Sequence, residues 1–90
     1  MATVSLYNAG KRFLCVLAEP LGEDFWIACR QRLRFDVPDD QPTVSWYEDG
    51  VSVWVHDGDP YDLVVTTEAG DIVTCGYQRP PGAFDRPKGS

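Results

Sequence analysis

The sequence predicts a mainly β domain, a small antiparallel meander or barrel made of β-hairpins. Turn signals rich in Gly, Pro, Asn and Asp recur at intervals of roughly 8 to 14 residues, the spacing of small all-β domains. The segments between the turns are rich in β-branched and aromatic residues, which favour strands. Hydrophobic residues make up 43% and charged residues 24% of 90 residues, as expected for one globular domain.

The clearest predicted hairpin spans residues 43–57. Asp49-Gly50 is a favoured pair for the centre of a two-residue type I′ turn, because both positions need a positive φ. Such a turn would pair Trp46 with Val53. The face expected in the core carries Val44, Trp46, Val51, Val53 and Val55. The opposite face, expected to be wetter, carries Thr43, Ser45, Tyr47, Ser52, Trp54 and His56.

Two further hairpins are predicted. Residues 62–77 are expected to turn at Ala69-Gly70 and to lie centrally in a sheet, because both of their faces are apolar. The turn would place Val64, Thr66, Val73 and Cys75 on one face and Leu63, Val65 and Ile72 on the other. Residues 3–17 are expected to turn at 8–10. Their core candidates are Val4, Leu6, Phe13, Cys15 and Leu17.

Residues 23–35 fit two structures equally well. As a strand, the segment alternates apolar residues with Arg30, Arg32 and Arg34. As a helix over about 23–34, it has acids in the first turn and arginines in the last, which complements the helix dipole. One such short helix would make the fold α+β. The domain is expected to span residues 1–77, and the Pro-rich residues 78–90 are expected to form a flexible C-terminal tail.

The three cysteines predict a protein of a reducing compartment. Cys15, Cys29 and Cys75 are an odd number without a C-x-x-C pair and have apolar neighbours, so we expect buried free thiols. The N-terminus lacks the basic and apolar regions of a signal peptide, and no apolar run reaches the roughly 18 residues of a membrane span. A cytoplasmic protein without membrane contact is expected.

The charges are distributed unevenly along the chain. Residues 35–78 contain ten acids and no lysine or arginine, whereas residues 1–34 carry five bases against three acids. The ten acids are Asp36, Asp39, Asp40, Glu48, Asp49, Asp57, Asp59, Asp62, Glu68 and Asp71. Most lie in or beside turns. There they would either form a surface that attracts a basic partner, or merely solubilise the protein and suit turn geometry.

No motif marks a catalytic residue, a cofactor site or a metal site. The nearest metal candidate, residues 57–62, lacks the oxygen ligand at position 5 and the glycine at position 6 that a Ca²⁺ loop needs. The only histidine, His56, would point to the opposite side of a strand from Asp57, so the two form no catalytic dyad. Neither an enzyme nor a bound cofactor or metal is expected.

Direct nucleic-acid binding is not expected either, because phosphate contacts need a basic surface and the net charge is -6. We expect the three arginines at 30, 32 and 34 to pair with acids or to face solvent. An acidic surface can instead occupy the nucleic-acid groove of another protein, because its carboxylates resemble phosphates in charge.

These observations favour a non-enzymatic protein-binding module that engages a basic, nucleic-acid-binding surface of a protein partner. A small acidic inhibitor, of the immunity or mobile-element counter-defence type, would fit the size and charge. Trp and Tyr are enriched at binding hot spots. The expected contact residues are therefore Tyr47, Trp54, His56, Asp57, Asp59 and Asp62. A structural or assembly subunit of a homo-oligomer or virion is the alternative, and a small-molecule-binding barrel is a third.

Overall fold

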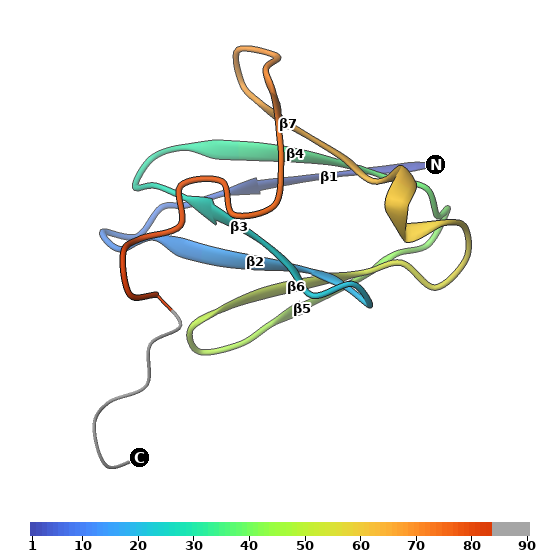
Figure 1. Cartoon of the computed structure of the whole chain (residues 1–90), viewed down its shortest axis with the longest axis horizontal. Coiled ribbons are helices and arrows are strands. Elements are labelled where there is room, and N and C mark those ends of the chain that lie inside the picture. The colour runs from blue at the N-terminus through green and yellow to red at the C-terminus, as the bar shows by residue number, and fades with distance from the viewer. Residues whose placement is uncertain (84–90) are drawn as a thin grey trace.

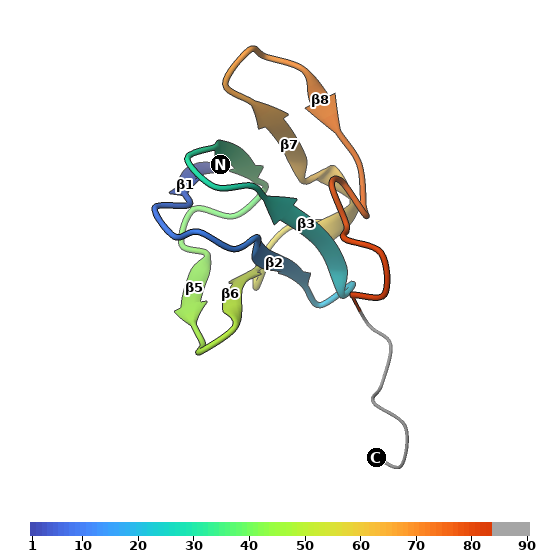
Figure 2. The same cartoon turned by 90° about the vertical axis from the view of Figure 1, so that its left-hand side faces the viewer.

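The computed structural model describes residues 1–83 and is a mainly β domain of two packed four-stranded sheets (Figure 1). The first sheet has the order β1–β4–β7–β8, with β1 at Ala2–Tyr7, β4 at Arg32–Val37, β7 at Val64–Thr67 and β8 at Ile72–Val73. The second sheet has the order β3–β2–β6–β5, with β3 at Glu23–Ile27, β2 at Leu14–Glu19, β6 at Gly50–Trp54 and β5 at Thr43–Trp46. Figure 2 shows the two sheets one above the other.

The two sheets do not close into a barrel, which was one of the two predicted architectures. The second sheet is also mixed, because β2 and β6 run parallel, with Cys15 opposite Gly50 and Leu17 opposite Ser52. After β3 the chain crosses to the other sheet to form β4 and returns as β5 and β6. That crossover brings β6 beside β2 in the same direction, which a purely antiparallel meander does not allow.

The core lies between the inner faces of the two sheets. Phe25 of β3 and Phe35 of β4 meet edge to face with ring centroids 5.7 Å apart, which ties one sheet to the other. Full burial of each such side chain contributes about 1.5–3 kcal/mol of transfer free energy. The buried apolar residues are Leu6, Val16, Ala18, Phe25, Ile27, Leu33, Phe35, Val37, Val51, Val53, Val55 and Val65.

The hairpin of β5 and β6 forms, but the predicted register is wrong by two residues. Trp46 pairs with Val51 rather than with Val53, and Tyr47 N donates to Gly50 O at 2.7 Å. Gly50 is therefore the first residue of β6 and not a turn residue. A Cβ on it would lie 2.5 Å from the carbonyl oxygen of Cys15, so the glycine is needed where β6 approaches β2. Because the shift is even, the predicted division into two faces holds.

Two aromatic residues expected in the core are exposed. Trp46 has the predicted inward-facing position on its strand but is 62% exposed, because β5 is the outermost strand of its sheet. Phe13 lies in the loop before β2 and is 45% exposed. The expectation of buried thiols is also wrong for Cys29 and Cys75, which are exposed, while Cys15 is half-buried.

The hairpin of β7 and β8 turns through three residues rather than two. Thr67 N donates to Asp71 O at 2.9 Å, and Gly70 takes the left-handed φ of 91° that this loop type requires. The extra loop residue shifts the predicted pairing by one and exchanges the faces of β8. Val65 therefore pairs with Val73, and Ile72 is 72% exposed.

Two further predictions are corrected by the sheet topology. Residues 3–17 form no hairpin, because β1 pairs with β4 whereas β2 pairs with β3 and β6 in the other sheet. The core residues of β2 are consequently Val16 and Ala18, not Cys15 and Leu17. Of the two structures that fit residues 23–35, the strand is confirmed and the helix does not form, but the segment is divided into two strands, one in each sheet. In the turn between them Gln31 N donates to Ala28 O at 3.0 Å.

The segment after β8 runs along the outer edge of β3. Trp26 N donates to Tyr77 O at 2.9 Å, and the side-chain amide Nε2 of Gln78 donates to Trp26 O at 2.9 Å. The first residues of the predicted tail, 78 and 79, therefore contact the domain. Residues 80–83 of the predicted tail form a turn in which Ala83 N donates to Pro80 O at 3.1 Å, and residues 84–90 lie outside the described residues.

Candidate functional site

The outer face of the second sheet carries a row of aromatic and small residues. Cys15 of β2 pairs with Trp26 on one side and with Gly50 on the other, and Gly50 is followed across the hairpin by Tyr47. This cross-strand row has a large ring at each end, with a thiol and a residue without a side chain between them. We call this surface the aromatic face and define it by Cys15, Leu17, Trp26, Tyr47 and Trp54. Ser52 points to the same side of β6 but is only 5% exposed.

The row produces a shallow pocket of about 270 Å³. It is lined by Cys15, Leu17, Trp26, Tyr47, Asp49, Gly50 and Val51. Neighbouring strands lie about 4.8 Å apart, so the backbones of Trp26 and Tyr47, three strand spacings apart, are separated by roughly 14 Å. Because small residues fill the middle positions, the rings form walls and the sheet forms the floor. Asp49 is the one charged residue of the lining.

Trp26 is held by a buried carboxylate. Its Nε1 donates to Asp24 Oδ2 at 2.7 Å, and Asp24 is only 3% exposed. The guanidinium of Arg79 donates from Nε to Oδ2 at 2.7 Å and from Nη2 to Oδ1 at 2.5 Å. The hydrogen bonds from Arg79 hold the pKa of Asp24 well below its usual range, with smaller contributions from Trp26 and Cys75. The carboxylate therefore stays charged and fixes the indole.

The floor of the pocket is uncharged at neutral pH. Burial first, and then the nearby charge of Asp24, raise the pKa of the Cys15 thiol to about 11. A thiol in this state is a poor nucleophile, because the thiolate is the reactive form. Cys15 therefore acts as a small apolar residue of the floor.

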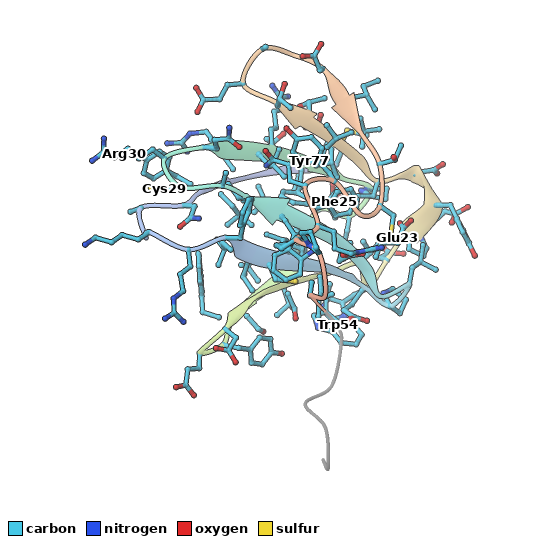
Figure 3. All side chains as sticks on the ribbon, turned by 60° about the vertical axis from the view of Figure 1, so that its left-hand side comes forward. Glu23, Phe25, Cys29, Arg30, Trp54 and Tyr77 are labelled. Atoms are coloured by element: carbon cyan, nitrogen blue, oxygen red, sulfur yellow. The ribbon has the colours of Figure 1, made fainter. Side chains whose placement is uncertain are left out.

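Three of the sequence-predicted site residues lie on the same outer face. Trp54 stacks on His56 with ring centroids 6.4 Å apart and an interplanar angle of 12°. His56 Nε2 lies 2.6 Å from Thr43 Oγ1, so the ring is tied to β5. Figure 3 shows Trp54 on the side of the second sheet that faces away from the first. Tyr47 is 60% exposed and lies at the other end of the hairpin, about 13 Å from Trp54 along the strand.

The other three predicted site residues lie together in the loop between β6 and β7. Asp57, Asp59 and Asp62 are all exposed, and they share with Asp40 the end of the sandwich at which the N-terminus is drawn in Figure 1. We call these four residues the acidic end. Asp59 also has a structural role, because it accepts the Tyr61 N–H at 3.0 Å and caps the short 3₁₀ turn at Pro60–Asp62.

The ten acids of residues 35–78 do not form one surface. Asp39 is 7% exposed and accepts backbone N–H groups of Gln41, His56 and Asp57 at 2.9, 2.7 and 3.0 Å. These bonds, that of Gln41 first, hold the pKa of Asp39 below its usual range. Asp39 is therefore a structural residue that joins two loops. Glu48 and Asp49 lie at the opposite end of the sandwich, beside Lys11 and Arg12, and Glu68 and Asp71 lie at the β7–β8 turn.

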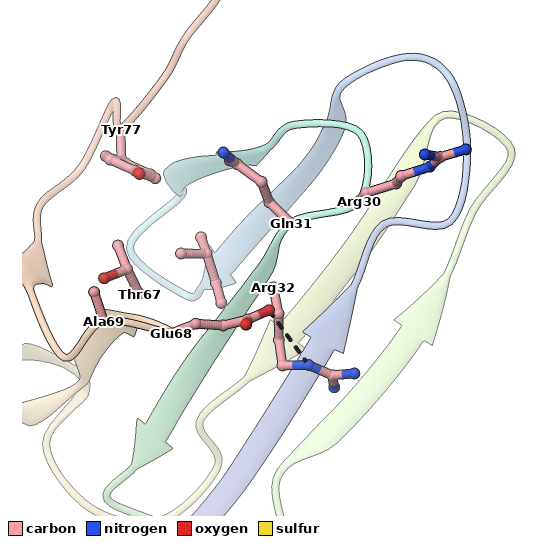
Figure 4. Close-up of a pocket in the computed structure, with 8 residues that line it drawn as sticks. Arg30, Gln31, Arg32, Thr67, Glu68, Ala69 and Tyr77 are labelled. Atoms are coloured by element: carbon pink, nitrogen blue, oxygen red, sulfur yellow. Dashed lines mark ion pairs between the residues drawn. The ribbon is translucent and has the colours of Figure 1, made fainter.

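The arginines of β4 are paired. Arg34 Nε lies 3.0 Å from Asp36 Oδ1, and Arg32 Nε lies 3.9 Å from Glu68 Oε1 while its guanidinium covers the ring of Tyr7 at 5.2 Å. A second pocket, of about 260 Å³, lies beside this Arg32–Glu68 pair (Figure 4). Arg30 points away from the other labelled lining residues, so the pocket does not gather free positive charge.

Sequence reasoning missed the residues that build the pocket. Trp26 and Cys15 carried no local signal, because the pairing of residue 15 with residue 50 joins strands distant in the chain. Asp24 and Arg79 were likewise not linked, since 55 positions separate them. The one available signal was the position of Trp26 between the buried residues Phe25 and Ile27, which places it on the opposite face of a strand.

Within residues 1–83, no three His, Cys, Asp or Glu side chains are grouped closely enough to hold a metal ion. No helix in this part of the chain is long and apolar enough to cross a membrane. The fold and the site together define a small two-sheet β domain with an exposed aromatic face. Comparison with protein-family models, with curated proteins and with solved structures finds no match to this chain.

Proposed function

We propose that this protein is a non-enzymatic protein-binding module that contacts its partner through the aromatic face and the adjoining acidic end. The observation that carries the proposal is the pocket between Trp26 and Tyr47 on the outside of a sheet. Outer sheet faces in contact with water are usually polar, and contiguous exposed apolar surface is typical of interaction sites. Trp and Tyr are also the residues most enriched at binding hot spots.

The acidic end supports a partner with a basic surface. His56 links the aromatic face to Asp57 along the chain, so a partner seated on Trp54 also meets the exposed carboxylates of Asp57, Asp59 and Asp62. The N-terminal ammonium group lies 2.6 Å from Asp40 Oδ1, so the net negative charge of this end comes from the carboxylates of the β6–β7 loop. These carboxylates speed encounter with a basic protein and fix its orientation. An inhibitor that occupies the nucleic-acid groove of its partner, of the immunity or counter-defence type, is the form of this function that we propose.

The chemistry of the candidate residues supports binding rather than catalysis. The raised pKa of Cys15 keeps it a neutral thiol, and the imidazole of His56 contacts a threonine hydroxyl and an indole. The three cysteines are free, which fits a reducing compartment, and we propose the cytoplasm as the location.

A second candidate function, a subunit of a larger assembly, is favoured by one specific feature. The outermost strand β5 carries no charged residue over Thr43–Trp46, and its Trp46 is 62% exposed. Uncharged edge strands are templates for pairing with another chain. In that case the contact would run through β5 and Trp46 and not through the aromatic face.

The test is affinity capture from the native host with three matched baits: the wild type, a Tyr47→Ala/Trp54→Ala variant and a Trp46→Ala variant. We expect one protein with a basic contact surface to be retained by the wild type and Trp46→Ala baits and lost from the double variant. Ile72→Ala, a change at an exposed apolar residue on β8 of the other sheet, serves as the control. A partner that is lost only from the Trp46→Ala bait would support the assembly role instead.

A further inference from the structure

We infer that the pocket between Trp26 and Tyr47 binds a single cationic side chain, lysine or arginine, of the partner protein. This inference rests on the proposed function and names the chemical group that the aromatic face recognises. The volume of the pocket, about 270 Å³, lies below the range of about 300–1,000 Å³ typical of sites for whole small molecules. A pocket of this size suits one long side chain presented by a protein surface.

The first argument is the shape of the cross-strand row. Trp26 and Tyr47 stand at its two ends, and between them Cys15 and Gly50 leave the centre open. An extended, flexible side chain can lie along this trough with its methylene groups on the apolar floor. Lysine and arginine bury their stems in this way while the charged head stays near the rim.

The second argument is charge complementarity. The lining contains one carboxylate, Asp49, and no basic residue. Lys11 and Arg12 line a neighbouring pocket that also contains Asp49, but they do not line this one. Arg79 is engaged with both oxygens of Asp24. The faces of aromatic rings attract cations, and Trp and Tyr are the most effective of the three aromatic side chains. An acidic side chain would be repelled by Asp49 and by the negative ring faces, whereas a cationic one is attracted by both.

The third argument is that one wall of the pocket is preorganised. The indole of Trp26 donates to Asp24 at 2.7 Å, and Arg79 fixes that carboxylate from the other side. A ring held in place before binding loses less conformational freedom when the ligand arrives. Arg79 is therefore a positioning residue for this pocket, since it acts on the ligand only through Asp24 and Trp26.

The experiment uses blocked amino acids as probes and the full-length protein labelled with ¹⁵N. N-acetyl-lysine methylamide and N-acetyl-arginine methylamide are titrated at constant ionic strength, and N-acetyl-norleucine methylamide is the uncharged probe of similar shape. The protein has three tryptophans, so each indole N–H gives a separate signal. Trp46 points to the opposite face of the second sheet and serves as the internal reference.

We expect both cationic probes to shift the Trp26 indole and the Tyr47 amide with saturation at millimolar concentration, and to leave Trp46 unchanged. Norleucine should bind about tenfold more weakly, which corresponds to a cation–π contact between the exposed and the fully desolvated values. Asp49→Asn and Tyr47→Ala should each weaken the binding of lysine and arginine. Asp71→Asn and Tyr61→Ala, exposed residues outside the lining, are the matched controls and should change nothing.

Two results would overturn the inference. Equal shifts of Trp26 with norleucine and with lysine would make the pocket a purely apolar one, and the absence of any shift at tens of millimolar would show that it takes no such side chain. Neither result would refute the proposed function, because affinity capture tests the whole aromatic face independently. Conversely, if the pocket binds lysine but the double variant still captures the partner, the inference about the pocket stands and the proposed function is refuted.

Discussion

Arg79 holds both carboxylate oxygens of Asp24, 55 positions away in the sequence, with hydrogen bonds of 2.7 and 2.5 Å. This contact attaches the segment after β8 to the outer edge of β3, an edge that would otherwise present unpaired backbone groups. It also sets the orientation of Trp26, whose indole shares the same carboxylate. One ion pair thus links the segment after β8 to a wall of the candidate pocket.

The first prediction concerns this ion pair. Arg79→Ala leaves Asp24 buried and charged with only weaker donors, so the midpoint of thermal unfolding should fall by several degrees. Arg34→Ala removes the exposed pair with Asp36 and should lower the midpoint by much less, because exposed ion pairs contribute little. Circular dichroism melts of both variants provide the comparison. Equal effects would show that the Asp24 pair is no more than a surface contact.

The second prediction concerns pH and the buried Asp39. Its folded pKa lies below its unfolded value, so the charged form is favoured by folding. The resulting stabilisation is present above the unfolded pKa of about 3.9 and is lost as the pH falls through the folded pKa. Asp39→Asn should therefore be destabilised at pH 7, and its difference from the wild type should shrink below about pH 4. Denaturant unfolding across this pH range, with exposed Asp62→Asn as the control, measures the effect.

The third prediction concerns Gly50. A Cβ at this position would lie 2.5 Å from the carbonyl oxygen of Cys15, so Gly50→Ala forces β6 away from β2. We expect a loss of about 1–3 kcal/mol in the free energy of unfolding, the range for overpacked sites. At Gly10 the nearest atom to an added Cβ is a side-chain oxygen of Asn8 at 3.3 Å, so Gly10→Ala should cost less. If the two alanine variants unfold at the same urea concentration, the close approach of β2 and β6 does not require glycine.

The fourth prediction concerns the kinetics of partner binding. Asp57→Lys/Asp62→Lys should slow association and leave the melting temperature nearly unchanged, because both side chains are exposed. Asp59 is left intact because its carboxylate caps the 3₁₀ turn. Trp54→Ala should instead speed dissociation, since an aromatic anchor acts after encounter.

Surface plasmon resonance at two salt concentrations tests this fourth prediction. The Debye length falls from about 10 Å at 0.1 M salt to about 3 Å at 1 M, so association of the wild type should slow strongly over that range. The salt dependence should be smaller for the Asp57→Lys/Asp62→Lys variant. An association rate indifferent to salt and to both reversals would mean that the acidic end only solubilises the protein.

Local patterns in the sequence determined the β class and the faces of residues 43–57. Alternation with period two is a property of each strand, so it placed Val51, Val53 and Val55 inside and Tyr47 and Trp54 outside without knowledge of the partner strands. The same alternation survives an error of two residues in the register, which is why the misassigned turn at Asp49-Gly50 left both faces correct. At Gly70 the error was one residue, and the faces of β8 were exchanged.

Only the tertiary structure decided which strands meet and therefore where the pocket lies. Cys15 lies opposite Gly50 on the parallel strand β6 and opposite Trp26 on the antiparallel strand β3. Neither contact follows from a turn signal between adjacent segments. The exposure of Trp46 depends in the same way on β5 being the outermost strand of its sheet. Long-range pairing is chosen by the packing of two whole sheets against each other, and that choice is a collective property of the chain which no short stretch of residues contains.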